Sequence, residues 1–129
     1  MTRLFLDTHT FLWWVFEQPE LSAKAEGLIM DRGNEIVVSV VSPWEIVIKA
    51  RLGRLDVPED VPAFMREQLD RNGFTVLPVS LDHVLRVHDL PLLHNDPFDR
   101  LLVAQALHKA MPLVTRDGRL AAYGAETLW

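Results

Sequence analysis

Four carboxylic acids stand at the ends of segments that the sequence predicts to be strands, or in the first turns of segments that it predicts to be helices. Asp7 ends an apolar stretch, Asp117 follows another by two residues, and Glu45 and Asp99 lie in expected first turns. Carboxylates about 4 Å apart repel by roughly 4 kcal/mol per pair at an effective dielectric of 20. Such a cluster persists only with protonation, cationic side chains or a bound cation. An all-oxygen set in a chain without cysteine suits Mg²⁺ or Mn²⁺ better than zinc, and such an ion can promote hydrolysis of a phosphodiester.

Each acid also has an ordinary structural explanation. Glu45 and Ser42 have the spacing of a capping box. Asp96 is a candidate N-cap, and Asp99 a first-turn carboxylate favoured by the helix dipole. Asp117 precedes a glycine, as turn residues often do. The acid that directly follows the first apolar stretch is harder to explain in this way, because a carboxylate next to an inner strand needs a partner or a task.

Strands and helices are expected to alternate along the chain. Apolar and β-branched stretches predict strands at residues 3–7, 35–41, 74–79 and 112–115, with a further edge strand at 127–128. Helices are expected at residues 8–16, 22–30, from Ser42 onward, 60–72, 81–87, 96–109 and 119–123. This order predicts an α/β fold in which helices cover both faces of a parallel sheet of four to five strands. Functional groups collect beyond the carboxyl ends of such strands, which is where the acids fall.

Composition narrows the class of protein. The 129 residues are enough for one domain, expected to span residues 1–129. The absence of cysteine excludes disulfides and thiol chemistry. No apolar run is long enough to cross a bilayer and no leader pattern is evident, so we expect a soluble, cytoplasmic protein. A net charge of −5 gives no indication of nucleic-acid binding, which usually goes with a basic excess. It does not exclude such binding, because a nuclease that carries several carboxylates needs only a local basic patch.

Four segments carry motifs that are more specific than the acids alone. They are residues 4–15 (LFLDTHTFLWWV), 42–55 (SPWEIVIKARLGRL), 94–107 (HNDPFDRLLVAQAL) and 113–117 (LVTRD). In this order and spacing they resemble the PIN-domain ribonucleases, and more narrowly the VapC-type toxins of VapBC toxin–antitoxin pairs. The resemblance covers essentially the whole chain. It implies a PIN-like three-layer α/β/α sandwich and a Mg²⁺- or Mn²⁺-dependent endoribonuclease that leaves a 5′-phosphate and a 3′-hydroxyl.

The resemblance also assigns roles to individual residues. Asp7, Glu45, Asp99 and Asp117 match the four acids of the family, as catalytic residues and metal ligands. Asp7 and Asp99 are expected to hold the metal most directly. The resemblance implies that Asp96, Thr115, Thr8 and Ser42 support these four acids from the surrounding positions.

The same resemblance implies partners. These are an RNA substrate, a small VapB-like antitoxin that inserts into the acidic pocket, and a second copy of the chain in a homodimer or a larger assembly with the antitoxin. Lys49, Arg100 and Arg116 are candidates for contact with RNA phosphates, with solvated surface or an ion pair to an acid as the alternative. Arg51 and Arg54 are candidates for the same role or for anchoring the antitoxin.

Several other residues have two interpretations each. His9 and His94 lie near the acids, where they could act as general acids or only form hydrogen bonds within a loop. Residues 11–16 are apolar all round, which predicts a homodimer contact, an antitoxin groove, or burial under the helix that Ser22 begins. Trp44 is expected to pack in the core beneath the acids.

Two rival functions remain open from the sequence. An aspartate-nucleophile phosphohydrolase also places an acid after the first strand, but it needs a second acid two residues later, where this chain has His9. A receiver-like or PIN-derived binding module would use the acids only to hold an ion or a partner.

Overall fold

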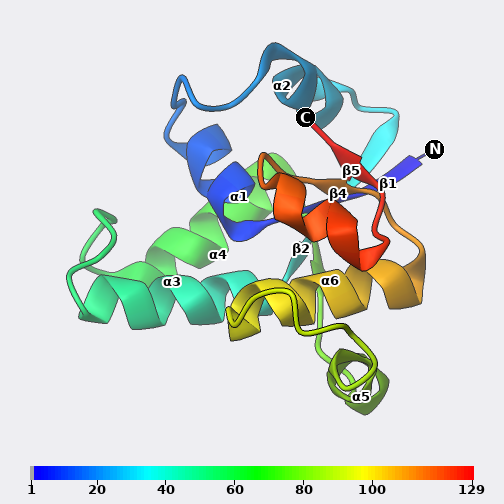
Figure 1. Cartoon of the computed structure of the whole chain (residues 1–129). Coiled ribbons are helices and arrows are strands. Elements are labelled where there is room, and N and C mark those ends of the chain that lie inside the picture. Colours follow the sequence, from blue (N-terminus) through cyan, green and yellow to red (C-terminus); the bar gives the residue numbers. More distant parts are fainter. Residues whose placement is uncertain (1) are drawn as a thin grey trace.

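A five-stranded sheet organises the computed structural model, which describes residues 2–129 (Figure 1). Its strands lie in the order β3-β2-β1-β4-β5, and every neighbouring pair is parallel. The strands are β1 (Thr2–Leu6), β2 (Asn34–Ser39), β3 (Thr75–Leu77), β4 (Leu113–Val114) and β5 (Thr127–Leu128). The predicted parallel sheet of four to five strands is confirmed, although β3 is shorter than the stretch at residues 74–79 suggested.

Helices lie on both sides of this sheet and complete three layers (Figure 1). They are α1 (Thr8–Val15), α2 (Ala23–Met30), α3 (Val41–Arg51), α4 (Val61–Asn72), α5 (Leu81–Val87), α6 (Pro97–Lys109) and a short 3-10 helix, η1 (Gly118–Tyr123). Helix α3 packs against α1 and α4 and also against α6, so that it joins the two outer layers at one end of the sheet. Among residues 2–129, no helix combines the length and the apolar character needed to cross a bilayer.

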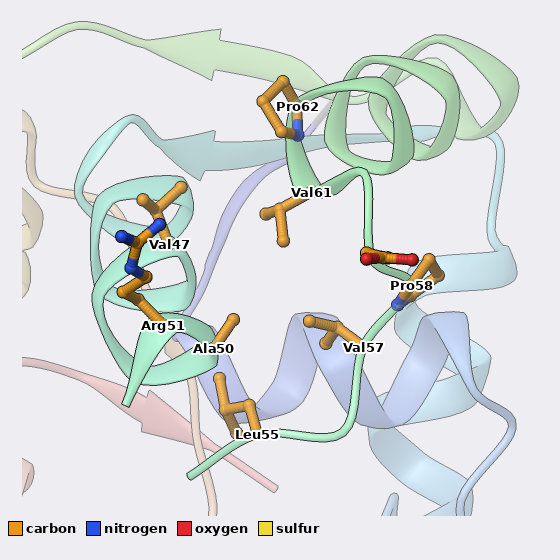
Figure 2. Close-up of a pocket in the computed structure, with 9 residues that line it drawn as sticks. Val47, Ala50, Arg51, Leu55, Val57, Pro58, Val61 and Pro62 are labelled. Atoms are coloured by element: carbon orange, nitrogen blue, oxygen red, sulfur yellow. The ribbon is translucent and has the colours of Figure 1, made fainter. Parts of the chain in front are cut away.

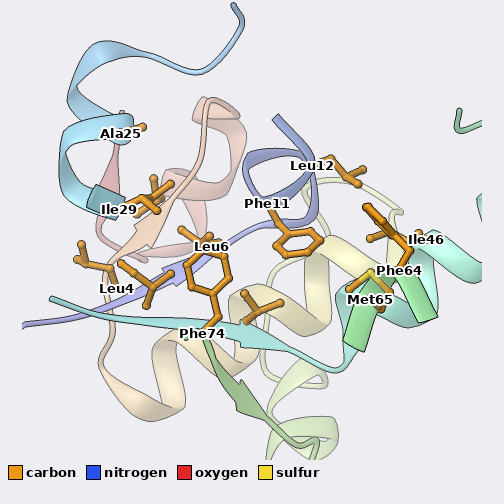
Figure 3. Packing of buried hydrophobic residues seen from close by; sticks show 13 residues of the cluster. Leu4, Leu6, Phe11, Leu12, Ala25, Ile29, Ile46, Phe64, Met65 and Phe74 are labelled. Atoms are coloured by element: carbon orange, nitrogen blue, oxygen red, sulfur yellow. The ribbon is translucent and has the colours of Figure 1, made fainter. Parts of the chain in front are cut away.

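Alternate residues of β1 enter two separate cores. Leu4 and Leu6 pack with Phe11 of α1, together with residues of α2 and α4 (Figure 3). Phe5 points to the opposite face and packs with Leu102 of α6. Successive side chains of a strand point to opposite faces, so an apolar strand in the middle of a parallel sheet supplies both cores at once. This burial fixes the carboxyl end of β1, where the first acid stands.

The apolar stretch at residues 11–16 is covered largely from within the chain. Phe11 and Leu12 are buried. Trp14 donates its indole N–H to the side-chain oxygen of Asn72 at the end of α4, at 3.0 Å. Phe16 stacks on Phe64 of the same helix, with ring centroids 5.5 Å apart. The partner of this stretch is therefore α4 as well as the core, and not only the helix that follows Ser22.

Helix α3 begins two residues earlier than the predicted cap at Ser42 implies. Its N-cap position is Val40, which makes no side-chain cap, and the hydroxyl of Ser39 accepts the N–H of Val41 instead. The capping box between Ser42 and Glu45 is therefore wrong. Both side chains lie inside the helix and are buried, so Glu45 is free for another role.

Candidate active site

Asp7 is the first residue after β1 and caps α1. One carboxylate oxygen accepts the N–H of Thr10 at 2.8 Å, and the other accepts the hydroxyl of Thr115, which follows β4. That hydroxyl also accepts the N–H of Asp117 at 3.0 Å. Burial raises the pKa of Asp7 above its usual range, although the hydrogen bonds from Thr10 and Thr115 oppose this. Thr115 therefore joins the acids at the ends of two neighbouring strands.

Asp96 and Asp99 stand together at the start of α6. One oxygen of Asp96 accepts the N–H groups of Phe98 and Asp99, at 2.9 and 3.1 Å, so Asp96 is the N-cap. Burial is the main reason that the pKa of Asp99 is raised to about 6. The negative charges of Asp96, Glu45 and Asp7 contribute to the same rise. Nε2 of His94 lies 3.4 Å from a carboxylate oxygen of Asp99. Asp99 is thus a carboxylate held among other carboxylates.

Glu45 enters from α3 with only 2% of its surface exposed. One of its oxygens pairs with Lys49, one turn further along the helix. The other oxygen is buried and has no hydrogen-bond partner within the described part of the chain. An unpartnered buried carboxylate oxygen is energetically unfavourable, so this atom is available to a ligand.

Asp117 caps η1 and faces a cation. It accepts the backbone N–H of Arg119 at 3.0 Å and two guanidinium N–H groups, the shorter at 2.7 Å. These hydrogen bonds to Arg119 hold the pKa of Asp117 below its usual range. Arg119 had no role in the sequence analysis, although its position two residues after an expected turn acid was a usable signal.

One hollow of about 250 Å³ unites most of these groups. Its walls include Asp7, Asp96, Asp99 and Asp117, together with His9, Trp13, Arg116 and Arg119. We call Asp7, Glu45, Asp96, Asp99 and Asp117 the acidic cluster. The structure brings the four predicted acids to one end of the sheet from four separate elements, which the sequence could suggest only through the rule for strand ends.

The acidic cluster suits a hard divalent cation in its donor chemistry. Every candidate ligand is a carboxylate, and the unpartnered oxygen of Glu45 and the raised pKa of Asp99 both mark unbalanced negative charge. In residues 2–129, no three acidic or histidine side chains already stand at the spacing of a coordination sphere. Lys49 and Arg119 each hold one of the acids, so cation binding competes with these two ion pairs.

Three predicted residues have different surroundings from those expected. Arg100 is buried, and its guanidinium donates to the carbonyl of Pro91 and the hydroxyl of Tyr123, so its predicted contact with RNA phosphates is wrong. The hydroxyls of Thr8 and Ser42 bond to each other at 2.9 Å and link α1 to α3. Thr8 follows Asp7 and Ser42 stands three residues before Glu45, but their bond acts on the junction of the two helices.

Trp44 also departs from its prediction. It is 52% exposed instead of packed in the core. The sequence analysis missed a further group, the hydroxyl of Tyr123, which bonds to Nδ1 of His94 on the side away from Asp99. His94 therefore lies between Tyr123 and an acid of the cluster. Only the fold brings these residues together, because 29 positions separate them in the chain.

Comparison with known proteins identifies the family. A family model for the PIN domain matches residues 4–126. The chain belongs to the PIN-domain family. Among curated relatives, ribonuclease VapC22 of Mycobacterium tuberculosis is 30% identical over 126 residues, which cover 95% of this chain and 93% of the relative. Ribonuclease VapC16 of the same organism is 35% identical over 74 residues, covering 54% of this chain and 51% of the relative. The resemblance to VapC-type PIN domains is confirmed.

Solved structures have the same PIN-domain fold. The VapBC2 complex of Rickettsia felis bound to a promoter DNA fragment contains a chain that matches with a TM-score of 0.71 and 14% identity, over 98% of both chains. VapBC-5 of Mycobacterium tuberculosis matches with a TM-score of 0.60 and 21% identity, over 99% of this chain and 97% of that one. At these identities the likeness concerns the fold, and it confirms the predicted three-layer arrangement.

Proposed function

We propose that this chain is a metal-dependent endoribonuclease that acts as the toxin of a toxin–antitoxin pair. The observation that carries the proposal is the convergence of Asp7, Glu45, Asp99 and Asp117 at one end of the sheet, on a PIN-domain fold. The named relatives that cover this chain are ribonucleases of the VapC group. A site in which carboxylates and cations predominate suits chemistry at a phosphodiester better than acyl or redox chemistry.

Asp7 and Asp99 are the residues that would hold Mg²⁺ or Mn²⁺ most directly. Glu45 and Asp117 would complete the site through water or a second ion. When bound, such an ion activates water and offsets the charge that develops on the phosphate. Thr115 fixes the orientation of Asp7 through its hydroxyl, and Nε2 of His94 lies 3.4 Å from a carboxylate oxygen of Asp99.

Cationic side chains at the hollow are the candidates for contact with RNA phosphates. Arg116 and Arg119 line it directly, and Lys49 pairs with Glu45 of the acidic cluster. Arg119 replaces Arg100 in this role, because its guanidinium is 65% exposed whereas that of Arg100 is buried. Phosphate contacts of this kind position the RNA without selecting its sequence.

Cleavage of RNA by the purified protein tests the proposal. We expect cleavage with Mg²⁺ or Mn²⁺, loss of cleavage with EDTA, and 5′-phosphate ends on the products. Asp7→Asn should abolish cleavage and toxicity on expression while the protein still folds. Asp70→Asn, at an exposed position of α4, is the matched control and should retain both. Cleavage by Asp7→Asn at the wild-type rate would overturn the assignment.

The resemblance implies that the antitoxin inserts into the acidic pocket, and we assign a second contact of the antitoxin to the groove between α3 and α4 (Figure 2). This hollow of about 560 Å³ is lined mainly by apolar side chains, among them Val47, Leu55, Val57 and Val61. Arg51 lies at its edge, which agrees with the anchoring role considered for it. Helix α3 also carries Glu45, so a peptide in the groove lies on the helix that supplies an acid of the cluster.

Neutralisation assays with the cognate antitoxin test the groove. Val47 is 47% exposed, so Val47→Asp adds a charge to the groove without a buried cavity. We expect this variant to cleave RNA at the wild-type rate but to resist neutralisation. Full neutralisation of Val47→Asp would place the antitoxin elsewhere.

We assign the homodimer contact to the exposed leucines of α5 and the loop that follows it. Leu81, Leu85 and Leu92 are 72%, 57% and 87% exposed, an unusual concentration of apolar surface on a small domain. A second copy that presents the same surface buries both sets. Sedimentation of Leu85→Lys should show a shift from dimer to monomer relative to the wild-type protein. An unchanged sedimentation profile would refute this surface.

A further inference from the structure

Trp44 is an exposed aromatic residue that directly precedes an acid of the cluster. It stands in the first turn of α3 with 52% of its surface accessible, whereas the next residue, Glu45, is 2% exposed. Successive residues of a helix point about 100° apart, so the acid turns inward while the indole faces solvent. Burial in the core does not explain this tryptophan.

A second aromatic residue supports Trp44 from α6. Phe98 directly precedes Asp99, and its ring meets the indole edge to face, with centroids 4.9 Å apart and planes 77° apart. The first turns of α3 and α6 lie next to each other, so the acid and the aromatic residue of one helix neighbour those of the other (Figure 1). An edge-to-face contact fixes the position of the indole while most of its surface stays open.

A cation accompanies this aromatic pair. Nζ of Lys49 lies 6.0 Å from the centroid of the Phe98 ring and pairs with Glu45. A nucleotide presents a flat base, and the exposed indole, held by Phe98, offers a flat face of the kind on which such a base stacks. Lys49 lies over the other ring of the pair, where Glu45 holds its ammonium group.

The other tryptophan at the acidic cluster is already covered. Trp13 packs against Trp129 with ring centroids 5.7 Å apart, and the guanidinium of Arg116 lies 5.9 Å from its ring. These neighbours take up part of the surface of Trp13, which lines the hollow, whereas 52% of the surface of Trp44 is exposed. Trp44 is therefore the better placed of the two to receive a ligand.

We propose that Trp44, supported by Phe98, is a stacking platform for an unpaired base of the RNA, next to the phosphodiester that is cleaved. The proposal rests on the proposed ribonuclease function and adds the class of substrate, because a base inside a duplex is stacked on its neighbours and cannot reach the indole. Trp44 then positions the RNA and takes no part in the bond-breaking step. Stacking accepts any base, so the platform selects single-stranded RNA without selecting its sequence.

Binding of a single-stranded oligonucleotide to the inactive Asp7→Asn protein tests the platform. Against this background we expect Trp44→Leu, which keeps an apolar side chain of similar reach, to weaken binding roughly 5- to 100-fold. Trp44→Phe should retain most of the affinity, because it retains an aromatic face. Met30→Ala removes an exposed apolar side chain from α2 and should leave binding unchanged. The oligonucleotide should also quench indole emission less in Trp44→Phe than in the parent protein.

Steady-state kinetics of Trp44→Leu in the protein with wild-type Asp7 distinguish a role in positioning the RNA from a role in catalysis. We expect Trp44→Leu to raise KM for single-stranded RNA with little change in kcat. Equal binding by Trp44→Leu and its parent would overturn the platform. Normal cleavage by Trp44→Leu together with loss of neutralisation would also overturn it, because Trp44 would then belong to the antitoxin surface. Absence of cleavage by the wild-type protein itself would instead refute the proposed function.

Discussion

Asp99 should destabilise the metal-free protein at neutral and alkaline pH. Its pKa is raised from 3.8 to about 6 by burial and by the neighbouring charges of Asp96 and Glu45. The folded state therefore holds the proton of Asp99 more tightly than the unfolded chain does, and folding is less favourable once the group ionises. This loss of stability is complete above pH 6 and disappears as the pH falls from about 6 to 3.8.

The size of the effect follows from the same values. A rise from 3.8 to about 6 is a difference of about 2 units, which corresponds to at most about 3 kcal/mol at about 1.36 kcal/mol per unit. The Asp99 side chain is 20% exposed, and solvent screening reduces this figure. We expect Asp99→Asn to raise the free energy of unfolding by about 1–2 kcal/mol at pH 8.

Urea denaturation in EDTA at pH 8 and at pH 4 measures this gain. The gain should be present at pH 8 and largely absent at pH 4, which lies below the pKa of about 6 in the folded state and close to the value of 3.8 in the unfolded chain. Asp117→Asn is the control of opposite sign, because Arg119 lowers the pKa of Asp117 and the ionised form therefore favours folding. The reasoning is refuted if the free energy of unfolding of Asp99→Asn does not exceed that of the wild-type protein at pH 8. It is also refuted if the gain at pH 4 is as large as the gain at pH 8.

Further predictions concern other parts of the site and the core. Thr115→Val removes the hydroxyl that orients Asp7 and should lower kcat for RNA about tenfold or more, in line with the loss of a positioning group, while Thr115→Ser retains activity. Arg119→Ala frees Asp117 and should raise the pKa of that carboxyl toward its usual value, measured by NMR titration, and tighten Mg²⁺ binding, measured by calorimetry. Phe5→Ala empties a fully buried position and should lower the free energy of unfolding by about 3–5 kcal/mol in urea titrations.

The sequence by itself determined the order of the elements and the position of the acids along them. Short apolar stretches alternate with helical segments, and this local pattern was enough to predict a parallel sheet. A strand that is buried on both faces of such a sheet has a continuous apolar sequence, which can be recognised without the fold. Asp7 and Asp117 could then be placed at one edge, because parallel strands end on the same side. A supporting role for the hydroxyl of Thr115 came only from the resemblance to the PIN-domain family, because no local pattern assigns a partner to that hydroxyl.

Only the tertiary structure decided which way the helical side chains point. The N-cap of α3 is Val40, two residues before the predicted cap, so Ser42 and Glu45 lie inside the helix and do not form a capping box. Glu45 and Trp44 therefore have surroundings that no local pattern fixed. Arg100 directly follows an acid of the cluster, yet its guanidinium bonds to Tyr123, 23 positions further along the chain. Contacts between elements distant in sequence determine helix phase and ion-pair partners, because only folding brings the competing groups within reach of one another.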